Sequence, residues 1–123
     1  MPKKILLVDD SLTTRMTNRT IISRRTGHDV VCAANGPEAL KMVGAERPDL
    51  VLMDVMMPGM DGLEVCRRLR QEGSTANLPI VLLTFRVDDQ SIVDGFDSGC
   101  TVYLKKPLVE TELLQALKKY LGD

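Results

Sequence analysis

The stretch PDLVLMDVMMPG, residues 48–59, decides the fold. Its apolar run at residues 50–53 shows no alternation with polar residues, which is typical of a parallel strand buried on both faces of its sheet. The run ends on an acid, Asp54, followed by a Pro-Gly turn at residues 58–59. The stretch therefore predicts a central strand that delivers one carboxylate to the edge of a sheet.

Four further short apolar runs repeat this pattern along the chain, at residues 5–8, 30–33, 80–83 and 102–104. Between the runs, apolar residues recur at helical spacing, as in the pair Val65 and Leu69. Strands that alternate with helices require right-handed crossovers. We expect an α/β fold, a doubly wound five-stranded parallel sheet in the order 2-1-3-4-5 flanked by five helices (flavodoxin-like), in one domain over residues 1–123.

Composition narrows the class of protein. The chain has 123 residues, of which 44% are hydrophobic and 27% charged, and its formal net charge is -1. These values are ordinary for a folded domain and give no general attraction to nucleic acid or to membranes. The chain has three cysteines and a single histidine, His28, which do not suggest a disulfide framework or a zinc site. The apolar run before Asp9 is only four residues long, at residues 5–8, which is too short for a signal peptide, so we expect a cytoplasmic protein.

Polar side chains gather where the predicted strands end. Asp9 and Asp10 follow the first strand and Asp54 ends the third, and these strands are neighbours in the predicted order. Carboxylates without nearby histidine or thiolate suit Mg²⁺, which also binds phosphate oxygens. Thr84 follows the fourth strand and Lys105-Lys106-Pro107 the fifth. This set predicts a site for Mg²⁺ and a phosphoryl group, with Asp54 as nucleophile because it stands apart from the paired acids.

These residues resemble the receiver domain of two-component response regulators, over essentially the whole chain. The resemblance is carried by residues 5–11, 48–62, 79–84 and 103–107. It implies that Asp54 accepts a phosphoryl group from the phosphohistidine of a sensor histidine kinase or phosphotransfer protein. It also implies that Asp9, Asp10 and the backbone carbonyl of Met56 organise Mg²⁺. Such a domain is a phosphoacceptor that assists its own phosphoryl transfer and hydrolysis, and is not an enzyme acting on a separate substrate.

The resemblance also implies which residues respond to phosphorylation and change the shape of the domain. Thr84 and Lys106 match the hydroxyl and the lysine that contact the phosphoryl group, and Lys106 is selected over Lys105 because the family lysine directly precedes proline, often across a cis peptide. Tyr103 matches the aromatic ring that turns inward and remodels the face built by the helix at 88–96, the strand at 102–104 and the last helix. That face would bind an output protein or an attached effector domain; nucleic acid and membrane binding by this domain are not expected.

Phe85 departs from the family pattern, in which the residue after the threonine is usually small. Its ring could narrow the entrance to the site or fill the inward space of Tyr103, and so slow the access of small phosphodonors or water. Met56 and Arg86 occupy positions where the family tunes the lifetime of the phosphoryl group.

Several alternatives stay open from the sequence. Asp10 could cap the first helix, Tyr103 could be an ordinary packed ring, and His28 reads as a plain surface histidine. A haloacid-dehalogenase-like phosphatase would need acids two residues apart, whereas Asp9 and Asp10 are adjacent. A phosphorylation-independent pseudo-receiver would not need the complete set of site residues.

Overall fold

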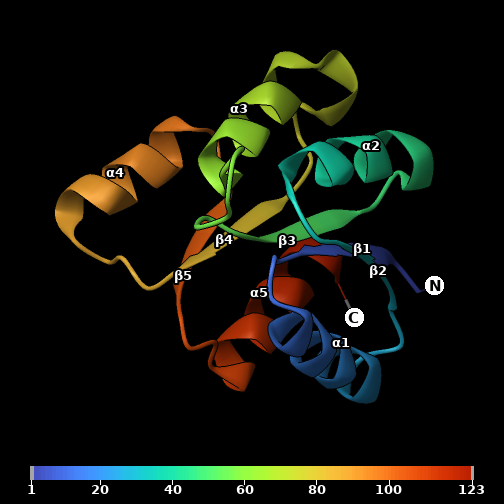
Figure 1. Cartoon of the computed structure of the whole chain (residues 1–123). Coiled ribbons are helices and arrows are strands. Elements are labelled where there is room, and N and C mark those ends of the chain that lie inside the picture. The colour runs from blue at the N-terminus through green and yellow to red at the C-terminus, as the bar shows by residue number, and fades with distance from the viewer. Residues whose placement is uncertain (1, 123) are drawn as a thin grey trace.

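A parallel sheet runs through the middle of the computed structural model, which describes residues 2–122, and helices cover both of its faces (Figure 1). The strand order is β2-β1-β3-β4-β5, as the sequence predicts. The strands are β1 (Lys4–Val8), β2 (Asp29–Ala33), β3 (Leu50–Asp54), β4 (Ile80–Thr84) and β5 (Val102–Lys105). Because β1 pairs with β3 and β3 with β4, the carboxyl ends of these three strands lie side by side.

Four of the five α-helices that the structure describes begin directly after a polar side chain that caps them. The α-helices are α1 (Leu12–Arg25), α2 (Gly36–Glu46), α3 (Gly62–Gln71), α4 (Asp89–Asp97) and α5 (Glu110–Leu121), with a short 3₁₀ helix at Gly73–Thr75. The side chains of Asn35 and Asp61 accept hydrogen bonds from the backbone N–H groups of Glu38 and Glu64. Ser11 caps α1, so the alternative in which Asp10 is the cap is wrong.

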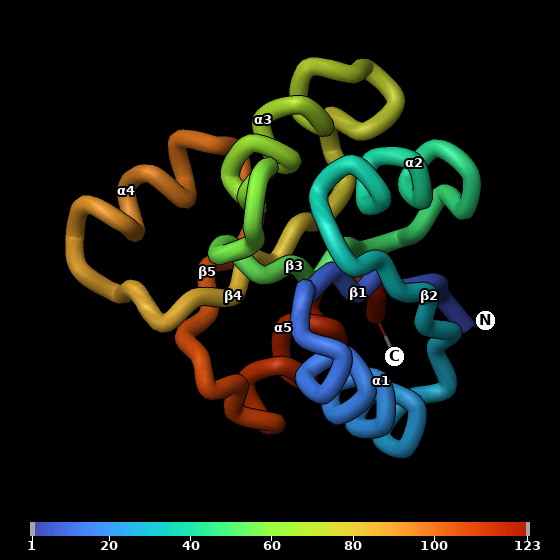
Figure 2. The backbone as a smooth tube through the Cα atoms, viewed as in Figure 1, coloured from blue at the N-terminus to red at the C-terminus, as the bar shows by residue number. Residues whose placement is uncertain are grey.

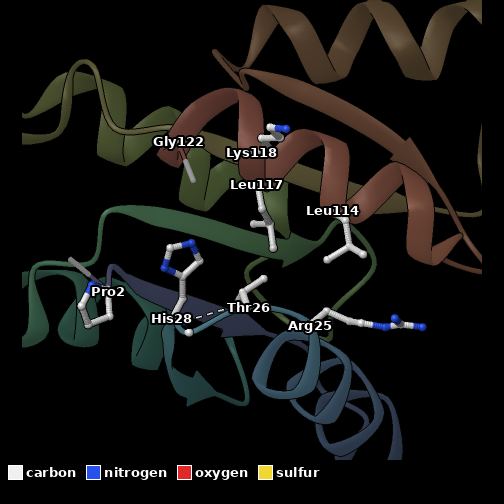
Figure 3. A pocket seen from close by; sticks show the side chains of 9 residues that line it. Pro2, Arg25, Thr26, His28, Leu114, Leu117, Lys118 and Gly122 are labelled. Atoms are coloured by element: carbon white, nitrogen blue, oxygen red, sulfur yellow. Dashed lines mark hydrogen bonds between the residues drawn. The ribbon is translucent and has the colours of Figure 1, made fainter.

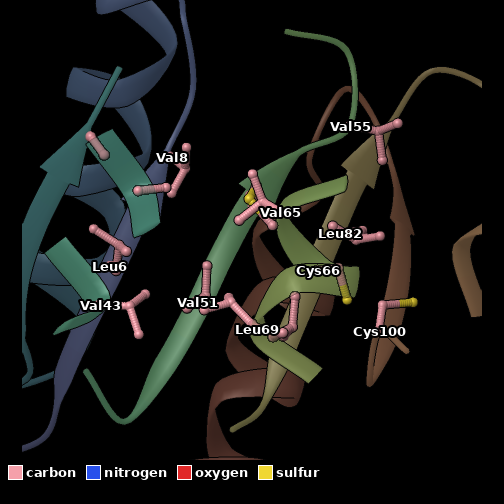
Figure 4. Close-up of a cluster of buried hydrophobic side chains, with 14 of the residues drawn as sticks. Leu6, Val8, Val43, Val51, Val55, Val65, Cys66, Leu69, Leu82 and Cys100 are labelled. Carbon is pink, nitrogen blue, oxygen red and sulfur yellow. The ribbon is translucent and has the colours of Figure 1, made fainter. Parts of the chain in front are cut away.

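The five strands divide the core into two clusters, because successive side chains of a strand point to opposite faces. On one face, Leu6, Val51 and Leu82 pack against α2 and α3 (Figure 4). On the other face, Leu7 and Leu52 pack with residues of α1 and α5, which lie next to each other (Figure 2). Every residue of β3 and β4 is buried, which explains their uninterrupted apolar sequence. None of the described helices combines the length and apolar character needed to cross a bilayer.

The end of the molecule remote from the acids holds a pocket of about 590 Å³ between the ends of α1 and α5 (Figure 3). Its lining includes Arg25, His28 and Leu117. The Nδ1 atom of His28 accepts a hydrogen bond of 3.0 Å from the backbone N–H of Lys3, so the histidine helps to fix the start of β1. The residues predicted to carry chemistry lie at the other edge of the sheet.

Candidate functional site

Three carboxylates converge at the carboxyl edge of the sheet. Asp9 follows β1, Asp54 ends β3, and one oxygen of each of Asp9, Asp10 and Asp54 lies within 4.8 Å of the others. Asp9 is 1% exposed and Asp54 is 5% exposed, whereas Asp10 is exposed. At that separation two unit charges repel by about 3.5 kcal/mol for an effective dielectric constant near 20. A positive charge is therefore needed among them.

Lys106 supplies that charge. Its Nζ lies 3.0 Å from Oδ2 of Asp54 and 3.2 Å from Oδ2 of Asp9. The lysine follows β5, precedes Pro107 across a cis peptide bond, and donates its backbone N–H to the carbonyl of Thr84 at 2.7 Å. Lys105 is exposed to solvent. The structure thus brings to the acids the lysine that the resemblance selects.

Burial and charge act against each other in this cluster. Burial raises the pKa of Asp54, and the hydrogen bond and charge of Lys106 only partly counter that effect. Burial opposes the charge on Lys106, but the two carboxylates outweigh it, so the pKa of Lys106 is raised. The lysine is held as a cation, while the charge of Asp54 is costly. An additional cation near Asp54 would therefore be favourable.

Backbone groups orient two of the carboxylates. Oδ1 of Asp9 accepts the N–H of Ser11 at 2.8 Å, and Oδ1 of Asp54 accepts the N–H of Met56 at 3.3 Å. Gly62 approaches the same strand end so closely that a Cβ there would lie 2.5 Å from the carbonyl oxygen of Asp54. Only glycine fits at that position, which accounts for the Asp-Gly pair that starts α3.

Arg15 is a site residue that the sequence reasoning missed. Its guanidinium donates a hydrogen bond of 2.5 Å to the backbone carbonyl of Asp9 and so ties α1 to the end of β1. The sequence offers one signal for this role, because Arg15 is a cation close to the N-terminus of a helix. A cation there opposes the helix dipole and needs a compensating partner.

Thr84 and Tyr103 are joined through the backbone of Arg86. Thr84 is fully buried at the end of β4, and its hydroxyl accepts the N–H of Arg86 at 3.0 Å. The hydroxyl of Tyr103 donates to the carbonyl of Arg86 at 2.7 Å. The ring of Tyr103 lies against Gly95 of α4, where a Cβ would come within 2.5 Å of a ring carbon. The two predicted switch residues therefore share one contact, on the loop between β4 and α4.

Phe85 is at the rim of the site. Its side chain is 67% exposed, and the Nζ of Lys106 lies 5.6 Å from the centre of its ring. Of the two expectations for this residue, filling the inward space of Tyr103 is wrong, because so exposed a ring cannot occupy a buried space. Narrowing the entrance stays a prediction that this position supports.

The acids and Lys106 form one end of a pocket of about 510 Å³, whose walls are α1, the residue Met56, and the segment after Lys106. Phe85 lines the same pocket. The available side-chain donors near the acids are carboxylate oxygens, which fit Mg²⁺ in both number and chemistry. The predicted ligation by the Met56 carbonyl stays a prediction.

The chain matches the model of the response regulator receiver domain over residues 5–118. The chain belongs to this family. It is 45% identical over 121 residues to the response regulator MprA of Mycolicibacterium vanbaalenii, covering 98% of this chain and 51% of MprA. The chain thus spans about half the length of that curated relative.

Solved receiver structures share the whole fold. The chemotaxis protein CheY4 of Vibrio cholerae is 32% identical, with a TM-score of 0.90 over 98% of this chain and 99% of that one. The receiver domain of the sensor histidine kinase PA1611 of Pseudomonas aeruginosa is 28% identical, with a TM-score of 0.89 over 100% of both chains. The latter structure has a magnesium ion coordinated in its active site cleft. Membership of this family sets aside the phosphatase alternative.

Proposed function

We propose that this domain accepts a phosphoryl group on Asp54, with Mg²⁺ bound, from the phosphohistidine of a sensor histidine kinase or phosphotransfer protein in the cytoplasm. One observation carries the proposal. The carboxylate of Asp54 is buried among other carboxylates and its Oδ2 lies 3.0 Å from the ammonium of Lys106, within a pocket open to a donor. Family membership supports the two-component role.

The transfer forms one bond and breaks one. An oxygen of Asp54 attacks phosphorus, the phosphorus–nitrogen bond of phosphohistidine breaks, and the imidazole leaves with the electron pair. Asp9, Asp10, Asp54 and the Met56 carbonyl would hold Mg²⁺, which neutralises charge on the phosphoryl oxygens. Lys106 is already between Asp9 and Asp54 and would follow the phosphoryl group to one of its oxygens. The same geometry lets water later attack the acyl phosphate, so the domain assists its own dephosphorylation.

Thr84 and Tyr103 then transmit the effect of phosphorylation to the surface of the domain. In the structure the Thr84 hydroxyl accepts the N–H of Arg86, and Tyr103 donates to the carbonyl of that residue. When the hydroxyl moves toward a phosphoryl oxygen in order to donate to it, its oxygen leaves the Arg86 N–H, and the loop that also holds Tyr103 moves. We propose that this shifts the population of the face formed by α4, β5 and α5, to which an output protein or an attached effector domain responds.

Phosphorylation by a small donor tests acceptance. The wild type is incubated with phosphoramidate, with and without Mg²⁺, beside Asp54→Asn and a control, Asp61→Asn, in which the changed carboxyl only caps α3. We expect the intact mass to rise by one phosphoryl group in the wild type and in the control when Mg²⁺ is present. A gain of equal size in Asp54→Asn would refute the assignment of the acceptor. No gain in any of the proteins would favour the pseudo-receiver.

A further inference from the structure

Asp10 is the least anchored of the three carboxylates that gather at the carboxyl edge of the sheet. The side chains of Asp9 and Asp54 both bind the ammonium of Lys106. Asp10 is exposed, and no residue between 2 and 122 forms a hydrogen bond or an ion pair with its side chain. One of its oxygens nevertheless lies within 4.8 Å of oxygens of the other two acids. The backbone around Asp10 must therefore set the place of its carboxylate.

Arg15 holds this backbone on both sides of Asp10. Its guanidinium donates a hydrogen bond of 2.5 Å to the carbonyl oxygen of Asp9, and its backbone N–H donates one of 3.0 Å to the carbonyl oxygen of Ser11. Because a peptide unit is planar, a carbonyl oxygen that is held in place also fixes the plane in which the next Cα lies. The side chain of Arg15 thereby fixes the direction in which the chain enters Asp10. A substitution of Arg15 removes this bond and leaves the backbone bond to Ser11.

The other hydrogen bonds of Asp9 do not replace the bond to Arg15. The N–H of Asp9 donates to the carbonyl of Ala33 at 3.2 Å, and its Oδ2 accepts from the ammonium of Lys106 at 3.2 Å. These bonds hold the end of β1 and the Asp9 side chain. Within residues 2–122, only the guanidinium of Arg15 engages the carbonyl that leads into Asp10.

The positive charge of Arg15 and its hydrogen bond act on a bound metal in opposite directions. A cation beside the acids repels Mg²⁺. Arg15 is only half-buried, so solvent and salt screen this repulsion. A residue that orients a metal ligand from outside the coordination shell typically contributes about 10–100-fold to metal affinity. Orientation should therefore outweigh repulsion, and because the two effects differ in sign, an experiment can tell them apart.

We infer that Arg15 is a positioning residue for Mg²⁺, which holds the peptide between Asp9 and Asp10 so that the Asp10 carboxylate stays close to those of Asp9 and Asp54. The inference rests on the proposed function, because it takes Mg²⁺ as the occupant of the acidic site. Without the guanidinium, this peptide is free to turn and the exposed Asp10 side chain moves toward solvent. Mg²⁺ demands near-ideal geometry from its ligands, so a displaced carboxylate weakens its binding.

Titration with MgCl₂ at constant ionic strength, followed through backbone amide shifts by NMR, measures the Kd for Mg²⁺ in the wild type, Arg15→Gln and Arg15→Lys. The control is Arg19→Gln, which removes an exposed positive charge one turn further along α1. We expect the Kd to rise about tenfold in Arg15→Gln. Arg15→Lys should lie between that variant and the wild type, because its ammonium keeps a donor for the Asp9 carbonyl. The control should keep the wild-type Kd.

A second substitution, Asp10→Asn, tests whether Arg15 acts through Asp10. In that background Arg15→Gln should raise the Kd little further, and fully additive losses of affinity would overturn the inference. A Kd for Arg15→Gln at or below the wild-type value would also overturn it, because only the effect of charge would then remain. So would a lower urea midpoint with an unchanged Kd, which would make Arg15 purely structural. A wild type without any Mg²⁺-dependent shift would instead count against the proposed function, and the inference would fall with it.

Discussion

Replacing Lys106 with methionine tests whether a single cation holds the carboxylates together. The Nζ–oxygen distances of 3.0 and 3.2 Å correspond to attractions of about 5 kcal/mol each at an effective dielectric constant of 20. The two attractions together are an upper bound on the loss of stability. A carboxylate that has lost its lysine can take up a proton, and water can enter the site. Breaking a buried ion pair typically costs about 3–5 kcal/mol. We expect a loss of that size in the free energy of unfolding of Lys106→Met at neutral pH without divalent metal.

The loss in the free energy of unfolding of Lys106→Met should depend on pH and on Mg²⁺. The folded-state pKa of Asp54 is already raised by burial, and it should rise further without the lysine. With a raised pKa, the protonated carboxyl of Asp54 favours the folded state. The variant should therefore regain stability as pH falls toward the folded-state pKa of Asp54, and lose stability as pH rises through that pKa. Mg²⁺ should also restore part of the loss, because it binds the folded cluster in place of the ammonium.

Urea unfolding, followed by circular dichroism across pH and with saturating Mg²⁺, measures all three effects. The matched control is Lys105→Met, which removes an exposed neighbouring charge. We expect the control to stay within about 0.5 kcal/mol of the wild type. If Lys106→Met were as stable as the control, or if Mg²⁺ stabilised both variants equally, the electrostatic account of the site would be refuted.

Phe85, Gly95 and Cys100 each allow a further test. Phe85→Ala should speed phosphorylation by phosphoramidate several-fold in a stopped-flow assay, because the ring stands at the rim of the pocket; an unchanged rate would remove Phe85 from the entrance. Gly95→Ala should cost about 1–3 kcal/mol in urea unfolding, against the usual gain for alanine in a helix, because the new Cβ meets the ring of Tyr103. The cost should disappear in a Tyr103→Ala background, and its persistence there would contradict the clash. Burial raises the pKa of the Cys100 thiol to about 12, so in the folded protein iodoacetamide should modify the partly exposed Cys32 well before Cys100, as judged by peptide mass, and comparable rates would show that Cys100 is not protected. The same shift predicts that stability falls as pH rises from about 9 toward 12, since the unfolded thiol ionises first.

The strands could be predicted from the sequence because burial dictates their composition. The apolar runs match the observed strands to within about one residue, and the additions are polar ends such as Lys4 and Asp29, which pairing brings into the sheet. The helix expected at residues 88–96 is observed as α4 at Asp89–Asp97. The predicted strand order then placed Asp9 close to Asp54, since adjacent parallel strands end at the same edge of the sheet.

Other features of the site depend on side-chain directions that no local pattern encodes. The bond from Arg15 to the Asp9 carbonyl and the exposed position of Phe85 belong to this group. The burial of Asn18 is similar, because an asparagine within a polar helix gives no sign of being buried until α1 is packed against the sheet. The choice of Lys106 over Lys105 came from the family resemblance, and the structure supplies its physical basis in the two ion pairs.

The position of the phosphoryl group on the chain can be read directly after chemical reduction. Treating the phosphorylated domain with borohydride reduces an acyl phosphate to an alcohol and so converts the modified aspartate to homoserine, which peptide mass spectrometry can place. We predict homoserine at position 54 alone, formed only when Mg²⁺ accompanied the donor. Homoserine at position 9 or 10, or equal labelling at position 54 without the metal, would contradict it.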